Sequence, residues 1–163
     1  TDNPVMRKFF TIANKYAGFV QIHTQIDGRF NDDILQLAND FPNVKVILAH
    51  CLPGAKPADL SRLFEARPNI FCELSAQGAI QNRLSGLSRP PRVFSYDGVR
   101  ADWSDLFKQH PTRVMVGSDA CCGWFGSYSE MIDEIRTNLL PYLAPELMEK
   151  LAYKNAVALF NLK

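Results

Sequence analysis

Apolar and polar residues alternate along this chain with two periods, one typical of strands and the other of helices. Four short apolar runs bounded by glycine, proline or asparagine predict strands. These predicted strands are residues 19–23, 44–50, 70–75 and 113–118. Elsewhere apolar residues recur three or four positions apart, which predicts amphipathic helices. These predicted helices are residues 4–16, 32–41 (with Asn31 as N-cap), 57–66, 102–109, 129–140 and 145 to about 160.

The predicted strands and helices follow one another at a regular distance. The strand ends at His23, His50 and Ser75 are separated by 27 and 25 residues, the length of a compact strand–helix unit. This alternation predicts an α/β fold with four parallel strands. Two architectures fit, a small open doubly wound sheet and half of a (β/α)8 barrel, because a complete barrel takes about 250 residues.

The step from the third strand to the fourth is longer than the others. Residues 77–101 contain Gly, Ser and Pro and lack sustained periodicity, so we expect a long loop over the active face of the sheet. Three of its arginines, Arg83, Arg89 and Arg92, are candidates for binding a substrate carboxylate, which a guanidinium group can hold bidentately. The alternative is that they are solvated surface charges.

Three predicted strands lead to a residue that can bind a metal. His23 and His50 end their strands, and Asp119 follows the fourth strand. Ligands bind beyond the carboxyl ends of parallel strands, so we expect these three side chains to face a common cavity. Imidazole and carboxylate are ligands of divalent metals such as zinc, which activates a bound water. A histidine at a strand end is also often structural, and His110, in a turn before Pro111, is interpreted that way.

Other residues near the predicted strand ends have two interpretations each. Cys51, Cys121 and Cys122 could reach a metal, or they could be small buried thiols. Trp124 could stack on a substrate or pack beneath its loop. Glu73 could point into a polar interior or form a salt bridge on the outside of the sheet.

Composition narrows the function classes. Hydrophobic residues make up 47% and charged residues 21% of the chain, and the net charge is +1, so neither nucleic acid nor a membrane surface is an expected partner. No apolar run approaches the roughly 20 residues of a transmembrane helix, and no signal peptide is recognisable. The four cysteines lack the spacing of a disulfide framework, so we expect free thiols and a cytoplasmic protein.

Four segments resemble the C-terminal half of the amidohydrolase superfamily, in its amidohydrolase-related branch. They are residues 19–25 (FVQIHTQ), 44–54 (VKVILAHCLPG), 110–120 (HPTRVMVGSDA) and 154–162 (KNAVALFNL). The resemblance covers nearly the whole chain. It implies a single domain over residues 1–163, with strands five to eight of a TIM barrel and C-terminal helices in residues 129–163.

The resemblance also implies roles for the residues at the strand ends. His23 corresponds to a metal ligand, His50 to the histidine that contacts substrate or a second metal, and Asp119 to the aspartate that binds the metal and handles the proton. The divalent metal implied is zinc. The family's His-x-His pair on the first strand has no counterpart here, so this chain alone lacks part of the metal site.

The function implied is that of the C-terminal half of a metal-dependent hydrolase acting on a small carbonyl substrate, such as an amide, lactone or carboxylate. A decarboxylase of the same family and a non-catalytic half-barrel that serves assembly are the alternatives. A half-barrel has open strand edges and uncovered apolar surface, which predicts a homo-oligomer or a complementary N-terminal half-barrel as partner.

Overall fold

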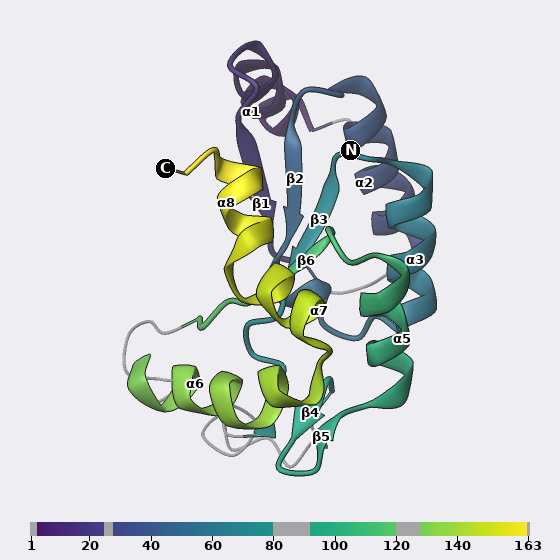
Figure 1. The fold of residues 1–163 in the computed structure, drawn as a ribbon. Coiled ribbons are helices and arrows are strands. Elements are labelled where there is room, and N and C mark those ends of the chain that lie inside the picture. The colour runs from purple at the N-terminus through teal and green to yellow at the C-terminus, as the bar shows by residue number, and fades with distance from the viewer. Residues whose placement is uncertain (1–2, 25–27, 80–91, 120–127, 163) are drawn as a thin grey trace. The chain divides into compact units, whose positions relative to one another are not determined.

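The protein has an α/β fold with four parallel strands, as the sequence predicts (Figure 1). It is described by a computed structural model that covers residues 3–24, 28–79, 92–119 and 128–162. The strands are β1 (Phe19–Ile22), β2 (Lys45–Leu48), β3 (Ile70–Glu73) and β6 (Val114–Met115), in the order β1-β2-β3-β6. The chain divides into two compact units, Thr1–Cys72 and Glu73–Lys163, and the boundary between them falls inside β3.

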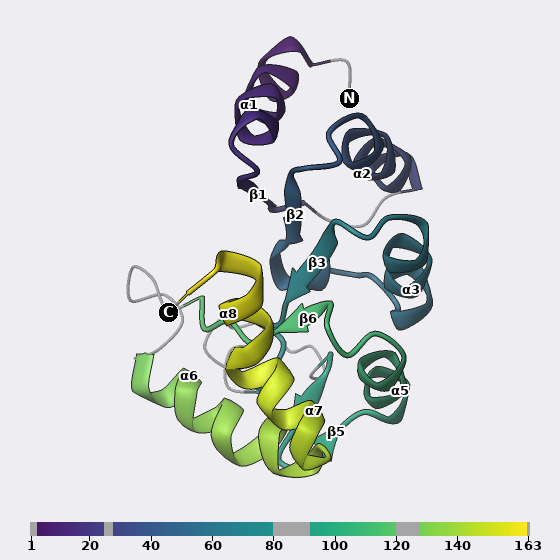
Figure 2. The same cartoon turned by 45° about the horizontal axis from the view of Figure 1, so that its top comes forward.

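The first unit contains three parallel strands and three helices, α1 (Pro4–Lys15), α2 (Gly28–Asp40) and α3 (Pro57–Ala66). Figure 2 shows α2 and α3 along the same side of the strands. Gln21 pairs with Ile47, and Ile47 pairs with Phe71, so these residues share one face of the sheet. On the opposite face, the residues of β2 and β3 are fully buried and form the core of the unit, whereas those of β1 are half-buried. The fully buried residues are Val46, Leu48, Ile70 and Cys72.

Helix α2 begins earlier than the sequence predicts. Asn31 lies inside the helix, which starts at Gly28, so the prediction that Asn31 is the N-cap is wrong. Local cap preference is a weak signal compared with tertiary packing. The helix is held by apolar residues three or four positions apart that face the strands, and Asn31 is buried with them. These apolar residues are Ile34, Leu37, Ala38 and Phe41.

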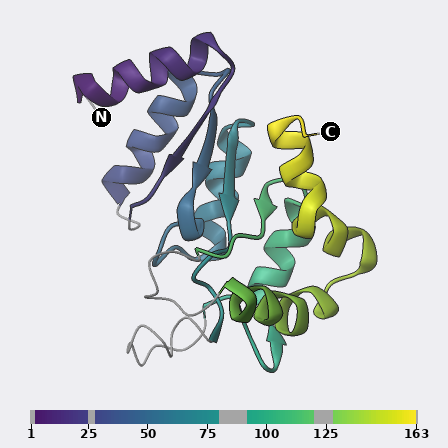
Figure 3. The ribbon, with the colours of Figure 1, turned by 90° about the vertical axis from the view of Figure 1, so that its left-hand side faces the viewer.

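Helix α1 forms where predicted, with Asn3 as its N-cap, but its apolar stripe is exposed. Phe10 is the buried residue of this helix, and its ring centroid lies 5.5 Å from that of Phe41 at the end of α2. Figure 3 shows the two helices, in purple and blue, beside one another. The large apolar residues left exposed, by 58–71%, are Val5, Phe9, Ile12 and Tyr16. We call these four residues the α1 stripe.

The second unit contains β6 and most of the C-terminal helices. Helix α5 (Ala101–Gln109) precedes β6, and α6 (Tyr128–Glu134) continues through a π-helical turn (Ile135–Leu139). Helix α7 (Pro145–Glu149) and α8 (Asn155–Phe160) are joined by a second π-helical turn (Lys150–Lys154). The two long helices predicted for residues 129–140 and 145–160 are therefore present. Their buried residues and those of α5 form the core of this unit, including Trp103, Phe107, Leu139 and Leu151.

The stretch 77–101 is more structured than predicted where the structure describes it. Its end forms an antiparallel hairpin of β4 (Phe94–Ser95) and β5 (Gly98–Val99). Gly98 has a φ of +98°, and a Cβ there would lie 2.4 Å from the Tyr142 ring, so both backbone and space require glycine. The Asp97-Gly98 pair is a sequence signal for a hairpin turn. The strands on either side have only two residues each, too short to show an alternating pattern. Residues 80–91 lie outside the described part of the chain.

Two asparagine side chains form hydrogen bonds with backbone carbonyls near the amino ends of the strands. Asn69 precedes β3, and its Nδ2 donates hydrogen bonds to three backbone carbonyls, those of Ala38, Phe41 and Val44. In the second unit, Asn155 Nδ2 donates to the carbonyls of Pro111 and Val114, at 2.9 and 2.7 Å. Each amide thus satisfies carbonyls that are buried or half-buried.

Candidate functional site

Two of the predicted site residues, His23 and His50, lie together at the carboxyl ends of β1 and β2. His23 directly follows β1, and His50 lies in a 3-10 turn, Ala49–Cys51, directly after β2. Their ring centroids are 4.9 Å apart, and the ring planes meet edge to face at 78°. His23 is exposed and His50 is half-buried. The first unit therefore presents two imidazoles side by side at one end of its parallel strands.

The backbone around His50 has an unusual conformation. β2 ends at Leu48, two residues before the predicted end, and the next segment turns sharply. His50, Cys51 and Leu52 have φ values of 55°, 45° and 56°, three successive residues in the left-handed region. This conformation costs L-residues about 1–2 kcal/mol each, so surrounding contacts must hold it. The turn aims His50 in a direction that a continued strand would not allow.

A disulfide between Cys51 and Cys72 holds this turn against β3. Both cysteines are fully buried. The expectation of free thiols is therefore wrong for these two residues. Linear spacing could not reveal the bond, because it depends on the register that places Leu48 beside Cys72 on the neighbouring strand. Cys121 and Cys122 lie outside the described residues.

Asp119, the third predicted site residue, lies in the second unit, beyond the end of β6. It is half-buried and has a left-handed φ of 49°. Aspartate tolerates this conformation better than most residues, and such backbone outliers concentrate at functional sites. Val116, Gly117 and Ser118 connect Asp119 to the strand.

Glu73, at the end of β3, is a buried acid in the same unit. Its Oε2 accepts a hydrogen bond from the Ser75 backbone N–H at 2.7 Å. A Cβ on Gly117 would lie 2.2 Å from this oxygen, so the carboxylate occupies the space that a side chain at Gly117 would need. Of the two interpretations of Glu73, the structure supports the interior one. The sequence signal for this packing is only the glycine two positions before Asp119.

Of the predicted substrate-binding residues, only Arg92 is described. It is half-buried, and burial lowers the pKa of its guanidinium, with a further lowering by the positive charge of Arg100. Arg100 itself forms an ion pair with Asp102 at 2.8 Å. Substrate contact by Arg92 stays a prediction. The candidates outside the described residues are Arg83, Arg89 and Trp124.

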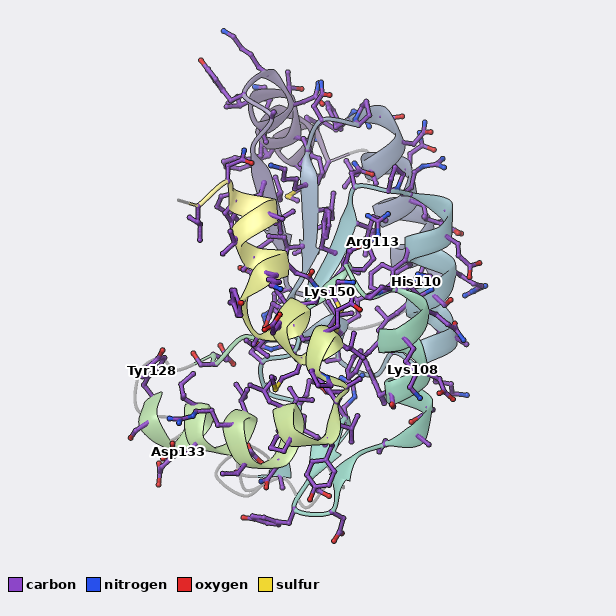
Figure 4. The ribbon with its side chains drawn as sticks, viewed as in Figure 1. Lys108, His110, Arg113, Tyr128, Asp133 and Lys150 are labelled. Carbon is purple, nitrogen blue, oxygen red and sulfur yellow. A yellow bond between two sulfur atoms is a disulfide. The ribbon has the colours of Figure 1, made fainter. Side chains whose placement is uncertain are left out.

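His110 occupies the turn between α5 and β6, near Arg113 (Figure 4). Its N–H donates to the Leu106 carbonyl at 2.9 Å, and its carbonyl accepts from the Arg113 N–H at 3.1 Å. These bonds close the helix and lead into the strand at its amino end. Because both are backbone bonds, the interpretation of the His110 side chain as structural stays a prediction.

The described donor atoms meet part of the needs of a metal ion. Within the described segments, no group of three or more His, Cys, Asp or Glu residues could hold one. The adjacent His23 and His50 rings nevertheless offer the nitrogen ligands that zinc prefers. This chain therefore provides a partial ligand set that fits zinc chemistry. No described helix has the length and apolar character needed to cross a membrane.

Comparison with known proteins identifies the family. The family model for amidohydrolases of the amidohydrolase 2 type matches residues 1–162, which is nearly the entire chain. The chain belongs to the amidohydrolase 2 family. No curated protein matches it in sequence.

Solved structures similar to this amidohydrolase 2 chain are TIM-barrel proteins. An uncharacterized TIM-barrel protein from Bordetella bronchiseptica superposes with a TM-score of 0.65 at 17% identity, over 98% of this chain and 51% of its own. An amidohydrolase from Burkholderia multivorans with bound zinc superposes with a TM-score of 0.63 at 17% identity, and the match covers 99% of this chain and 59% of that protein. Amidohydrolase 2 from Bifidobacterium longum subsp. infantis has a TM-score of 0.60 at 15% identity, and the match covers 99% of this chain and 56% of that protein. The chain therefore has the fold of part of a TIM barrel and spans little more than half the length of these proteins.

Proposed function

We propose that this chain is the C-terminal half of a metal-dependent hydrolase that acts on a small carbonyl substrate, such as an amide, lactone or carboxylate. The observation that carries the proposal is the pair of adjacent imidazoles, His23 and His50, at the carboxyl ends of neighbouring parallel strands. Membership of the amidohydrolase 2 family supports it. The zinc bound by the Burkholderia relative supports zinc as the metal.

Each residue at the strand ends has a distinct role in this proposal. His23 is a metal ligand, and Asp119 is a second ligand that accepts a proton from the attacking water and passes it to the leaving group. His50 donates a hydrogen bond to the substrate carbonyl and stabilises the negative charge that develops on its oxygen. A bound zinc ion would supply a water whose pKa is lowered to around 7.

Substrate binding is assigned to the arginines that follow β3. A guanidinium group pairs with a carboxylate through two parallel hydrogen bonds, which fixes orientation as well as charge. Arg92 is half-buried, which strengthens such a pairing because less solvent screens it. Arg83, Arg89 and Trp124 complete the proposed substrate site.

Zinc titration tests the metal site. Because this chain holds only part of the ligand set, we expect it to bind zinc weakly, and we expect His23→Ala and Asp119→Ala each to weaken binding further by at least about tenfold, since each removes a ligand. His110→Ala is the matched control, since His110 lies in a turn at the other end of the strands. Calorimetry with each purified variant gives the affinities. Equal zinc affinity in all four proteins would contradict the proposed site.

A non-catalytic role in assembly is the second candidate, and the exposed α1 stripe favours it. Four large apolar side chains on one helix face are typical of a surface that another protein segment covers. In the hydrolase proposal this segment is a complementary N-terminal half-barrel, which also provides the missing metal ligands. The similar structures, of which this chain covers 51–59%, have chains long enough to contain both halves.

A further inference from the structure

Glu73 is a buried acid that the proposed mechanism does not use. It lies on the last position of β3 and is only 8% exposed. Burying a carboxylate is unfavourable unless hydrogen bonds compensate the lost water. One of these bonds is the 2.7 Å contact from the Ser75 N–H to Glu73 Oε2. The side chain therefore folds back over the end of its own strand.

The same carboxylate fills the space beside the end of β6. A Cβ on Gly117 would lie 2.2 Å from Glu73 Oε2, 3.1 Å from its Cδ and 3.3 Å from Ser75 Cβ. Gly117 does not have a left-handed φ, so the need for glycine is one of space. Glu73 thus packs directly against the backbone of the segment that leads to Asp119.

The carboxylate lies where backbone pairing beside β6 stops. Leu74 N–H donates to the Met115 carbonyl at 2.9 Å. One residue later, Val116 N–H donates instead to Leu151, on the helix that follows. Beyond that point Gly117 has the Glu73 side chain as its neighbour. Backbone hydrogen bonds therefore hold Met115 and Val116, and contact with the Glu73 side chain holds Gly117.

We propose that Glu73 is a positioning residue that holds the segment Gly117-Ser118-Asp119 and thereby orients the Asp119 carboxylate. Asp119 needs such support because its left-handed backbone, with φ of 49°, is intrinsically unfavourable. The role of Asp119 in metal binding rests on the proposed function. The packing of Glu73 against Gly117 is independent of that function.

A second acid and glycine pair in the same unit provides a matched control. Glu134 is 4% exposed, and a Cβ on Gly78 would lie 2.4 Å from its Oε2. This pair has the same chemistry as Glu73 and Gly117, but its glycine lies in the segment after β3; Glu134 also lines a small cavity together with Gly117 and Ser118. Glu134→Ala therefore measures the general cost of removing a buried acid here.

Residue-resolved amide hydrogen exchange tests the proposal. In Glu73→Ala we expect the amides of residues 117–119 to exchange about tenfold faster, while those of α5 change by less than about threefold. Glu73→Gln keeps the shape and an acceptor oxygen, so its exchange should stay within about threefold of the parent. Glu134→Ala enlarges a cavity that Gly117 and Ser118 also line, but it leaves the Glu73–Gly117 contact in place, so exchange at residues 117–119 should rise by less than about threefold. The proposal is overturned if exchange in Glu73→Ala accelerates as much in α5 as at residues 117–119, or does not accelerate at residues 117–119. It is also overturned if these amides exchange as fast in Glu73→Gln as in Glu73→Ala.

A zinc double-mutant cycle separates this inference from the proposed function. If Glu73 acts through Asp119, Glu73→Ala weakens zinc binding about tenfold in the parent and has no further effect in Asp119→Ala. An equal loss in both backgrounds would overturn the proposal. If Asp119→Ala does not change zinc affinity, the metal role of Asp119 is wrong, and the exchange measurement alone decides the role of Glu73.

Discussion

Gly117 shows how a single backbone position constrains the region around Asp119. We predict that Gly117→Ala destabilises the protein by about 1–3 kcal/mol, because the added Cβ displaces the Glu73 carboxylate from the Ser75 N–H. Urea denaturation gives the free energy of unfolding. Gly18→Ala is the control, since its Cβ would meet nothing closer than 3.5 Å, and it should be neutral or slightly stabilising. Equal stability of the two variants would contradict this packing.

At the residue scale, position along a strand was predictable and contact across strands was not. The strand-end rule placed His23 and His50 at the same end of the sheet, and the structure brings their rings together. The Cys51–Cys72 bond joins the turn after β2 to β3, and the packing of Glu73 on Gly117 joins β3 to the segment after β6. Such contacts depend on register, which hydrophobic patterning of one strand alone does not specify.

At the element scale, periodicity predicted the helices well but not always the face that each one buries. The α1 stripe predicts its helix correctly, yet the adjacent Phe10 is the residue that the structure buries. A helix with apolar residues on more than one face can pack two neighbours at once. Here Phe10 of α1 packs against Phe41, which follows α2, and the α1 stripe on the other face of the helix stays exposed. Strand lengths were overestimated, because β2, β3 and β6 end two or three residues before their predicted ends.

The ion pair between Arg7 and Asp40 joins α1 to α2, and it makes a prediction about pH. The hydrogen bond from Arg7, at 2.9 Å, lowers the pKa of Asp40 below its ordinary value of 3.8, and Gln36 and Asn39 add to this. Because the folded pKa is lowered, this contribution to stability is present above about pH 4 and is lost as the pH falls below it.

Replacing Arg7 by Gln should raise the pKa of Asp40 and reduce the loss of stability in acid. An NMR titration of the Asp40 carboxyl gives the pKa, and urea denaturation between pH 5 and roughly 2 gives the stability profile. Arg62→Gln is the control, since Arg62 pairs with Asp59 within α3 alone and leaves Asp40 untouched. An Asp40 pKa that is the same with and without Arg7 would show that the ion pair does not form in solution.

At the scale of the whole molecule, the exposed α1 stripe predicts association. Large apolar patches on soluble proteins are usually covered by a partner. We predict that the purified chain self-associates when no complementary half-barrel is present, and that Phe9→Ser with Ile12→Ser makes it monomeric without unfolding it. Light scattering after size-exclusion chromatography measures the mass.

Tyr128→Ser is the control for this prediction, because Tyr128 is equally exposed but lies on α6. This variant should associate like the parent. A parent chain that is monomeric over the accessible concentration range would rule out self-association and leave the complementary half as the proposed partner. The overall architecture was predictable because the strand–helix repeat and the family resemblance agree. What covers the α1 stripe was not, because the pattern that predicts a helix does not say which of its faces stays exposed.

The asparagine hydrogen bonds and the candidate site residues lie at opposite ends of the strands. Asn69 and Asn155 secure the amino ends, whereas His23, His50 and Asp119 follow the carboxyl ends. Substitutions among the proposed site residues therefore leave the hydrogen bonds of Asn69 and Asn155 intact. Such a separation lets evolution, or an engineer, exchange one reaction for another on this scaffold without having to rebuild it.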